Sequence, residues 1–585
     1  MYILGLATMG ESAAAILKDG ILIAAVEEER FTRIKHEGCF PIRSIDYCLT
    51  RAGISLSEID HVAVYWQPFR MGVRARAVLK TALRHPSRFM RKMGSALQEL
   101  TPAGGGESTA SHGSWLELFF VRSLLEKHFG ARKARVHYLD HHRCHMASAL
   151  FASPFEEATI LVIDGAGEEV STTLAVGAGT DIRVLKTIPW PHSLGHFYSA
   201  MTGFLGFTML DGEYKMMGLA PYNSPDYLKF IRRNILTTDA PGSYRLNDHL
   251  LDYHAALKRT FHPSFLDAFG SPRLSDEDPF TERHQKIACS TQAAFEEVVF
   301  DLALWAFKQG GKRTNVTIAG GCGLNCTANG RLLREGPFER IYVPPAPHDA
   351  GCALGAALLV HHELLRQPRQ FEMTHAFYGP EYGEKDIDRA LRAQGIEARP
   401  IADEEALLRR AVEALSSGQI LGWFQGPMEF GPRALGSRSF LADPRNDSIR
   451  DTINAKIKKR ELFRPFAPSV KEEAAADFFH ISQRSPFMNL AVPVRAHQRD
   501  RIPAVTHIDG SARIQTVNRT DNPRYWNLLD HFEKKTGIPI LLNTSFNIQE
   551  PIVCTPEQAL ITFAQSGVDA LVIGNYFIDR TIIRT

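Results

Sequence analysis

Short apolar runs separated by glycine turns open the chain. Residues 2–8 (YILGLAT), 13–20 (AAAILKDG) and 21–29 (ILIAAVEEE) follow this pattern, with a DG pair between the second and third runs. Apolar runs of strand length that flank such a pair indicate a β-hairpin. The three runs therefore predict a β-meander at the N-terminus.

The same layout returns later in the chain. Residues 158–169 (ATILVIDGAGEE), 171–179 (STTLAVGAG) and 181–189 (DIRVLKTIP) again predict strand, turn, strand, turn and strand. A layout that recurs in this way indicates an internal repeat. We therefore expect the N-terminal portion to contain two related halves.

A further strand pattern runs into glycines at residues 316–333 (VTIAGGCGLNCTANGRLL). Glycine-rich turns before helices expose backbone N–H groups that can bind phosphate, although many such turns only let a helix pack closely on a strand. Asp164 and Gly165 stand in a second strand-to-glycine turn. Two such turns in different halves fit the nucleotide cleft of the actin-like and sugar-kinase ATPases.

Residues 139–150 (LDHHRCHMASAL) place histidines at the head of an alanine-rich run that predicts a helix. His141 and His145 are four residues apart, so both imidazoles project from one helix face and suit a zinc or iron(II) site. Such a site needs a further ligand from elsewhere in the chain. The alternative interpretation is a polar helix start with ordinary hydrogen-bonding histidines.

A proline-rich segment, residues 342–359 (YVPPAPHDAGCALGAALL), offers that ligand. Asp349 precedes a helix of small residues, where a carboxylate can also serve as the N-cap. Together with His141 and His145 it would complete a set of two histidines and one carboxylate. Such a set leaves coordination positions open for phosphate or water.

From about residue 397 the sequence predicts a second α/β unit, which carries the densest group of cations. They stand in apolar or glycine-rich contexts, where a buried guanidinium needs an anion, and phosphate suits its fork. Structural ion pairs with Glu429, Glu461 and Asp443 are the alternative. The cations are Arg433, Arg438, Lys458, Arg460, Arg464 and Arg513, and the polar residues that accompany them are Asn543, Ser545 and Asn547.

Length, charge and composition narrow the function classes. A chain of 585 residues exceeds one ordinary core, so two or three domains are expected. The net charge of +2 offers little attraction to nucleic acid, and no apolar run reaches the roughly 18 residues of a membrane span. The N-terminus shows no signal-peptide pattern, and the eight cysteines form no C-x-x-C pair, so we expect a cytoplasmic protein with reduced thiols.

Residues 70–113, rich in Arg and Lys and then in Gly and Ser, predict a solvated insertion.

Longer motifs resemble one family over nearly the whole chain, the O-carbamoyltransferases of antibiotic and nodulation-factor biosynthesis. The motifs are EEERFTRIKH, DHHRCH, DGEYKMMGLAPY, AGGCGLNCTANGRL, PPAPHDAGCALGAAL, FGPRALGSRS, RELFRPFAPSV and NTSFN. The resemblance implies an α/β protein with a duplicated actin-like ATPase domain, similar to the tRNA threonylcarbamoyl-transfer proteins. It also implies a C-terminal α/β domain that is YrdC-like, resembling the threonylcarbamoyl-adenylate synthases. We place the two domains at residues 1–365 and 397–585, with a linker over 366–396.

The resemblance also assigns functional residues at matching motif positions. His141, His145 and Asp349 would hold iron(II) or a similar divalent metal. The carbamoyl phosphate site falls on Arg433, Lys458, Arg464, Arg513 and Ser545, to which we add Asn543 of the same unit. The adenylate site of the first domain falls near Asp164, Gly320, Gly321, Gly323 and Asn325, to which we add Gly165 of the same turn.

The implied reaction has two stages and uses ATP with Mg²⁺ on its phosphates. In the C-terminal domain carbamoyl phosphate loses phosphate, and the carbamate attacks the α-phosphorus of ATP to give carbamoyl adenylate and pyrophosphate. In the N-terminal domain a hydroxyl of a small-molecule acceptor attacks the carbonyl, and AMP leaves. Water must be excluded because the intermediate is hydrolytically labile.

The chain departs from the family pattern after the first predicted strand. Family members usually show a His-Asp pair there, whereas this chain has Gly10 and Glu11. A role of that histidine in deprotonating the acceptor would have to move to another side chain. The candidates for this general base are Glu11, Lys35, His36 and Glu213.

Small-molecule carbamoylation has two alternatives among the function classes. Carbamoyl-type transfer to a macromolecule, as in tRNA or hydrogenase maturation, conflicts with the near-neutral charge and the lack of zinc-finger cysteine pairs. A silent nucleotide-binding scaffold would tolerate loss of the cations and metal ligands, yet all matched positions are filled. We expect no membrane or nucleic-acid partner, and the sequence leaves a homodimer open.

Overall fold

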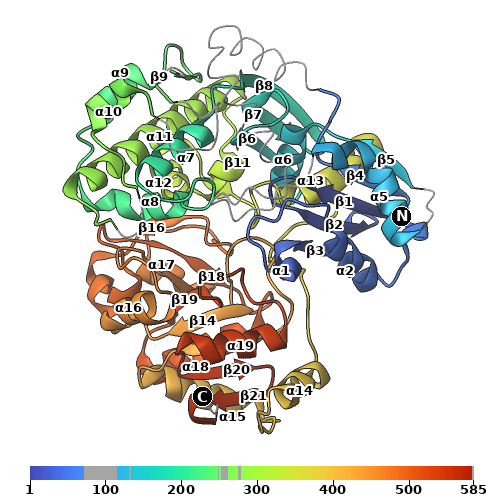
Figure 1. Ribbon diagram of the computed structural model, residues 1–585, viewed down its shortest axis with the longest axis vertical. Coiled ribbons are helices and arrows are strands. Elements are labelled where there is room, and N and C mark those ends of the chain that lie inside the picture. The colour runs from blue at the N-terminus through green and yellow to red at the C-terminus, as the bar shows by residue number, and fades with distance from the viewer. Residues whose placement is uncertain (71–114, 131–133, 248–249, 252–260, 275–277, 583–585) are drawn as a thin grey trace.

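The computed structural model describes residues 1–70, 115–130, 134–247, 250–251, 261–274 and 278–582. The predicted basic insertion, residues 70–113, lies outside this part of the chain except for Arg70. The N-terminal body (blue to yellow in Figure 1) rests on a C-terminal body (orange to red). None of the helices in the described ranges has the length and apolar character needed to cross a membrane.

The first sheet of the N-terminal body begins with the predicted meander. Its strands are β1 (Tyr2–Ala7), β2 (Ala13–Lys18), β3 (Ile21–Glu27), β4 (His61–Val64) and β5 (Arg135–Tyr138), in the order β3-β2-β1-β4-β5. β1, β2 and β3 pair antiparallel, whereas β4 and β5 join in parallel. Asp19 and Gly20 form the predicted turn, both at positive φ.

The second sheet repeats this arrangement strand for strand. Its strands are β6 (Glu157–Ile163), β7 (Val170–Ala178), β8 (Asp181–Pro189), β11 (Asn315–Ala319) and β12 (Arg340–Tyr342), in the order β8-β7-β6-β11-β12. The first three again pair antiparallel and the last two in parallel. The predicted duplication is confirmed, and two such sheets are the architecture expected of an actin-like domain.

Two helices of small residues lie at the centre of this body. α6 (His141–Leu150) and α13 (Gly351–Leu359) pack on each other, and α13 also covers β1 and β2. A side chain on Gly355 would collide with the carbonyl oxygen of Cys144 in α6. Only small residues allow two helix backbones to approach so closely. This packing brings the start of α6 next to the loop that precedes α13.

The remaining helices cover the two sheets. In the first half they are α1 (Glu29–Thr32), α2 (Ile42–Ala52) and α5 (Val121–Phe129). A helical layer beside the second sheet consists of α7 (Leu194–Phe204), α8 (Glu213–Leu219), α9 (Leu228–Asn234), α10 (Pro263–Phe269), α11 (Glu282–Gln309) and α12 (Cys326–Glu335), with the short ribbon β9 (Leu236–Thr237) and β10 (Arg245–Leu246) (Figure 1). The long helix α11 contacts α7, α8, α9 and α12 and so holds this layer together.

The C-terminal body contains one mixed sheet of seven strands. The strands are β13 (Leu421–Phe424), β14 (Arg438–Ala442), β15 (Ala467–Lys471), β18 (Gln515–Val517), β19 (Ile540–Ser545), β20 (Ala570–Ile573) and β21 (Tyr576–Asp579), in the order β18-β15-β19-β14-β13-β20-β21. A separate ribbon pairs β16 (Ala491–Pro493) with β17 (Ser511–Arg513). The helices are α14 (Glu384–Ala393), α15 (Glu404–Ser416), α16 (Ser448–Thr452), α17 (Ala475–Phe478), α18 (Pro523–Thr536) and α19 (Pro556–Ser566).

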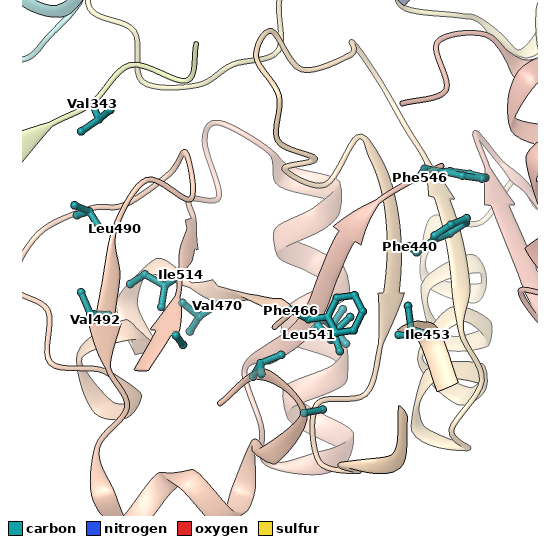
Figure 2. Close-up of a cluster of buried hydrophobic side chains, with 14 of the residues drawn as sticks. Val343, Phe440, Ile453, Phe466, Val470, Leu490, Val492, Ile514, Leu541 and Phe546 are labelled. Atoms are coloured by element: carbon teal, nitrogen blue, oxygen red, sulfur yellow. The ribbon is translucent and has the colours of Figure 1, made fainter. Parts of the chain in front are cut away.

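The core of this body lies against the sheet. Figure 2 shows part of it, including Phe440 of β14 and Leu541 of β19, together with Ile453, which directly follows α16. Phe466, directly before β15, is also buried and anchors the end of the RELFRPF segment. Within the predicted linker, α14 buries Ile387 in the same core, so part of residues 366–396 packs with the C-terminal body.

Candidate functional site

The two histidines of α6 converge with two aspartates in the N-terminal body. The Nε2 atoms of His141 and His145 are 3.2 Å apart, and each lies 3.6 Å from Oδ1 of Asp349. Oδ2 of Asp164 lies 3.2 Å from Nε2 of His141 and 3.9 Å from that of His145. Two imidazole nitrogens and two carboxylates that meet at one point fit the ligand set of a divalent metal.

The local fold explains why these side chains meet. Asp140 caps α6 by accepting a hydrogen bond from the Arg143 N–H, and Glu168 accepts one from the His141 N–H. The N-cap position of α13 is Ala350, so the N-cap interpretation of Asp349 is wrong, and its carboxylate faces the histidines instead. His142 turns away to Thr173, with 2.9 Å between Nδ1 and Oγ1.

The electrostatics of the cluster favour a cation. Burial alone would lower the pKa of His141, but the charges of Asp349 and Asp164 raise it to about 9. A group of carboxylates that draws a proton onto a buried imidazole also attracts a metal ion. Cys352 lies within reach of the two histidines, but burial raises the pKa of its thiol well above the usual value. A buried neutral thiol is a poor ligand, so the carboxylates fit the site better.

The carboxylate of Asp164 also reaches the glycine turn. Its Oδ1 accepts a hydrogen bond of 2.9 Å from the N–H of Gly321, which lies after β11. Gly320, at φ +87°, packs against the carbonyl of Ile163 so tightly that no side chain would fit. Asp164 therefore joins the candidate metal cluster to the turn that the sequence assigns to a nucleotide.

The other residues predicted at the nucleotide site have mixed surroundings. Gly165 lies in the turn after β6 and faces His196, whereas Gly323 packs on the ring of Pro347. The side chain of Asn325 caps α12 and pairs with Gln292. The close-packing interpretation of these glycines therefore holds for Gly320 and Gly323. The N–H groups of Gly320 and Gly323 donate to the carbonyls of Pro347 and Gly320, and that of Gly321 donates to Asp164.

Three of the base candidates gather in one polar network beside the cluster. His36 lies between two carboxylates, with Nδ1 at 3.1 Å from Glu11 and Nε2 at 3.2 Å from Asp211. Glu11 also contacts His348, and Lys35 lies 3.9 Å from Asp211. Burial opposes the charged form of His36, but the hydrogen bonds to Asp211 and Glu11 raise its pKa to about 11. His36 is therefore an imidazolium near neutral pH and a poor base.

Glu213 has a different surrounding from the other candidates. Its Oε1 accepts hydrogen bonds from the Ser199 hydroxyl at 2.6 Å and from the Leu210 N–H at 2.8 Å. Burial raises the pKa of this carboxyl. Because Leu210 precedes Asp211, the contact holds the Asp211 turn in place. Asp211 was not predicted as a functional residue, although it is the first residue of the DGEYKMMGLAPY motif.

The predicted phosphate-binding cations of the C-terminal body cluster together. Burial, followed by the charges of Arg513 and Arg464, lowers the pKa of Arg433 to about 9. Burial and the charge of Arg464 likewise lower the pKa of Arg513. In the described part of the chain no carboxylate pairs with Arg433 or Arg513, and the Nε of Arg433 has no hydrogen-bond partner. Arg464 lies 3.4 Å from Glu461, as the ion-pair alternative predicts for it. Arg433 and Arg513, held together without such a partner, form a site for an anion.

Lys458 and Ser545 meet at one edge of this cluster. The ammonium of Lys458 donates to the hydroxyl of Ser545 at 3.1 Å and to Oδ1 of Asn547 at 2.8 Å. Asn543 is buried behind them and donates to the Ala434 carbonyl and to the Ser469 hydroxyl. Asn543 therefore supports the loop that carries Arg433 through its hydrogen bond to Ala434.

Arg438 corrects one of the predicted anion contacts. Its guanidinium is fully buried and donates to the carbonyls of Gln425 at 2.9 Å and Pro380 at 3.0 Å, and it also contacts those of Gly426 and Ser437. The ring of Phe424 lies 3.7 Å from its central carbon. Both terminal nitrogens of Arg438 are thus bound by protein carbonyls, although its Nε has no partner, and Arg438 serves the fold.

We expect Arg438→Met to lower the free energy of unfolding by about 3 kcal/mol or more, because several buried carbonyls lose their donor. Urea unfolding followed by circular dichroism measures this. Arg445→Met is the matched control, because Arg445 is a partly exposed arginine of the same body whose partner is Asp443. If Arg438→Met were as stable as the wild type but had lost phosphate binding, Arg438 would have to be assigned to the anion site after all.

The segment that carries Arg464 meets the N-terminal body at α8. Arg464 lies over the ring of Tyr214, 4.6 Å from its centroid, and Lys215 is 3.4 Å from Glu461. Tyr214 and Lys215 belong to α8 of the N-terminal body. Burial lowers the pKa of Lys458 far below its usual value, and the charges of Arg460, Arg464 and the N-terminal Lys35 act in the same direction. The cation cluster therefore lies on the side of its body that meets α8 and Lys35 of the N-terminal body.

Comparison with known proteins agrees with these observations. Family models described as Carbamoyltransferase N-terminus and Carbamoyltransferase C-terminus match residues 2–358 and 412–580. The uncharacterized protein sll1178 of Synechocystis sp. is 42% identical over 615 residues, covering 99% of this chain and 97% of that protein. Nodulation protein NolNO of Sinorhizobium fredii is 40% identical over 587 residues, covering 98% and 79%.

Two solved structures are more distant. HypF of T. kodakarensis is 14% identical with a TM-score of 0.30, over 62% of this chain and 48% of that chain. The ROK hexokinase of Thermus thermophilus is 16% identical with a TM-score of 0.26, over 61% and 98%. The family matches, by contrast, span most of the sequence, and on that ground the chain belongs to the carbamoyltransferase family.

Proposed function

We propose that this chain is an O-carbamoyltransferase that uses carbamoyl phosphate and ATP. The C-terminal body makes carbamoyl adenylate, and the N-terminal body transfers the carbamoyl group to a hydroxyl of a small-molecule natural product. One observation carries the proposal beyond the family: Arg433 and Arg513, largely buried on one body, have no carboxylate partner among the described residues, and the other body holds a candidate metal cluster.

The first stage takes place at the cation cluster. One water molecule hydrolyses carbamoyl phosphate to carbamate and inorganic phosphate, and the carbamate oxygen then attacks the α-phosphorus of ATP with pyrophosphate as the leaving group. Arg433, Arg464 and Arg513 neutralise the negative charge of the phosphate groups, and Lys458 adds a donor beside Ser545. Mg²⁺ bound by the ATP phosphates would supply further neutralisation. The product is a mixed anhydride of carbamate and AMP.

The second stage takes place in the N-terminal body. The acceptor oxygen forms a bond to the carbamoyl carbon, the bond to the AMP oxygen breaks, and Glu213, the candidate base whose pKa burial raises, takes the hydroxyl proton. The glycine turn at Gly320 and Gly321, which lies beside Asp164, takes the phosphate of AMP against its backbone. His141, His145, Asp164 and Asp349 would hold iron(II), which, when bound, supplies positive charge next to the leaving phosphate.

Incubation of the protein with ATP and carbamoyl phosphate tests the first stage. We expect mass spectrometry of the quenched mixture to show carbamoyl adenylate, together with pyrophosphate that forms only when both substrates are present. Carbamoyl phosphate labelled in its carbonyl carbon should pass the label to the adenylate. Pyrophosphate release that is independent of carbamoyl phosphate, without the labelled adenylate, would contradict the proposal.

A further inference from the structure

The loop that carries Arg433 is fixed from both sides, and the two sides come from different bodies. On its own side, Oε1 of Glu429 accepts hydrogen bonds from the N–H groups of Leu435 at 2.7 Å and Ser437 at 2.8 Å. These bonds hold the loop after Arg433. The residue two positions before Arg433 is Gly431, and its backbone turns to the N-terminal body.

Both backbone polar groups of Gly431 are bound by the end of the first meander. Its N–H donates to Oε1 of Glu27 at 2.8 Å, and its carbonyl accepts from Nη2 of Arg30 at 2.8 Å. The same guanidinium lies 3.4 Å from Glu27 through Nε and 2.8 Å from Glu29 through Nη1. Glu27 and Arg30 are 4% and 2% exposed, so water does not compete for these bonds.

Gly431 is also pressed against the N-terminal body. Its φ is +113°, and a side chain there would lie 2.5 Å from the carbonyl oxygen of Pro345. Only glycine combines this backbone angle with such a close approach. The loop before Arg433 therefore takes its shape from contacts with β3, α1 and the proline-rich segment rather than from its own sheet.

The residues that bind Gly431 are tied to the acceptor side as well. Glu29, which pairs with Arg30, accepts a hydrogen bond of 3.0 Å from the N–H of His36. A chain of contacts thus leads from Gly431 through Arg30 and Glu29 to His36 of the acceptor network. One short segment, residues 27–36, contacts the machinery of both stages.

We infer that Glu27 and Arg30 position the carbamoyl phosphate loop of the other body, so that adenylate formation requires the two bodies to be docked. This inference rests on the proposed function and adds two positioning residues to it. When the clamp on Gly431 is lost, Arg433 moves away from its place beside Arg464 and Arg513, and a displacement of about 1 Å is enough to impair binding and catalysis. Formation of the labile intermediate is thereby restricted to the state in which the transfer site is next to it.

The test measures pyrophosphate release by the full-length chain at varied carbamoyl phosphate and at varied ATP. For Arg30→Met we expect the KM for carbamoyl phosphate to rise roughly tenfold or more, with the KM for ATP changed by less than about twofold. Arg30→Lys keeps a charge beside Glu27 and should recover part of the loss. A general loss of structure would not separate the two KM values in this way.

Two further variants make the outcome decisive. Arg334→Met removes another arginine whose guanidinium donates across the interface, to the carbonyl of Ala491 at 3.3 Å, and it should behave as the wild type. Glu27→Gln carries the test if Arg30→Met does not fold, because it keeps the side-chain shape and removes only the charge. Unchanged KM values in the Arg30 and Glu27 variants, or an equal rise in Arg334→Met, overturn the inference alone. Absence of adenylate from the wild type overturns the proposed function itself.

Discussion

Arg433→Met is expected to lower the rate of carbamoyl adenylate formation by at least about 100-fold, because it removes a positioned cation worth about 3 kcal/mol to a phosphoryl transition state. The folded protein should be at least as stable as the wild type. Arg433 has no carboxylate partner among the described residues, and neighbouring Arg513 and Arg464 repel its charge. A methionine of similar length fills the space without that repulsion.

The combination of lost activity and retained stability distinguishes a binding residue from a structural one. Labelled carbamoyl phosphate and mass spectrometry measure the adenylate, and urea unfolding measures the stability. Arg445→Met is the control, because the guanidinium of Arg445 is paired with Asp443, 3.0 Å from its Nε. If Arg433→Met kept its activity, or lost stability to the same degree as activity, the cation cluster would not be the phosphate site.

The parts of the fold that repeat locally were predictable from the sequence. Both meanders appear where apolar runs and turn residues placed them, since strand pairing between neighbours depends on short-range pattern. The pairing of His141 and His145 follows in the same way from helix geometry. Asp349 was predicted with two open roles, and the N-cap position of α13 is Ala350 instead.

The contacts that depend on distant packing were not predictable in this way. Asp164 was assigned to the nucleotide, and its second contact with the histidines arises only because β6 ends beside the start of α6. Arg438 was grouped with the anion-binding cations because its sequence neighbours are apolar or small. Which backbone carbonyls remain unpaired around a guanidinium is a property of the folded loops, and here they bind both of its terminal nitrogens.

The identity of the general base also depends on contacts between distant parts of the sequence. Four side chains were candidates, and no sequence pattern shows that His36 lies between Glu11 and Asp211. With its pKa raised to about 11 by those carboxylates, His36 holds a proton at neutral pH and orients the network. Against the effect of burial, His348 and His36 lower the pKa of Glu11, and His36 and Lys35 lower that of Asp211, so both carboxylates are weak bases. The interpretation of the base therefore shifts to Glu213, whose pKa burial raises.

His145→Ala is expected to abolish transfer to the acceptor while leaving carbamoyl adenylate formation within about twofold of the wild type, because the two stages use different bodies. The variant loses one of two imidazole ligands whose Nε2 atoms are 3.2 Å apart, so stoichiometric metal should be lost with it. Adenylate should then accumulate and hydrolyse, with AMP released in step with pyrophosphate.

Metal analysis of protein purified without chelator, and separate assays of the two stages, measure these effects. His142→Gln is the matched control, since His142 lies in the same turn of α6 and is equally buried, but its Nδ1 faces Thr173 rather than the cluster. It should keep both the metal and the transfer activity. The assignment fails if the wild type binds no metal, if His145→Ala retains it, or if both stages fall together in a folded variant. In the last case the cluster would act on adenylate formation as well, and the division of labour between the two bodies would be wrong.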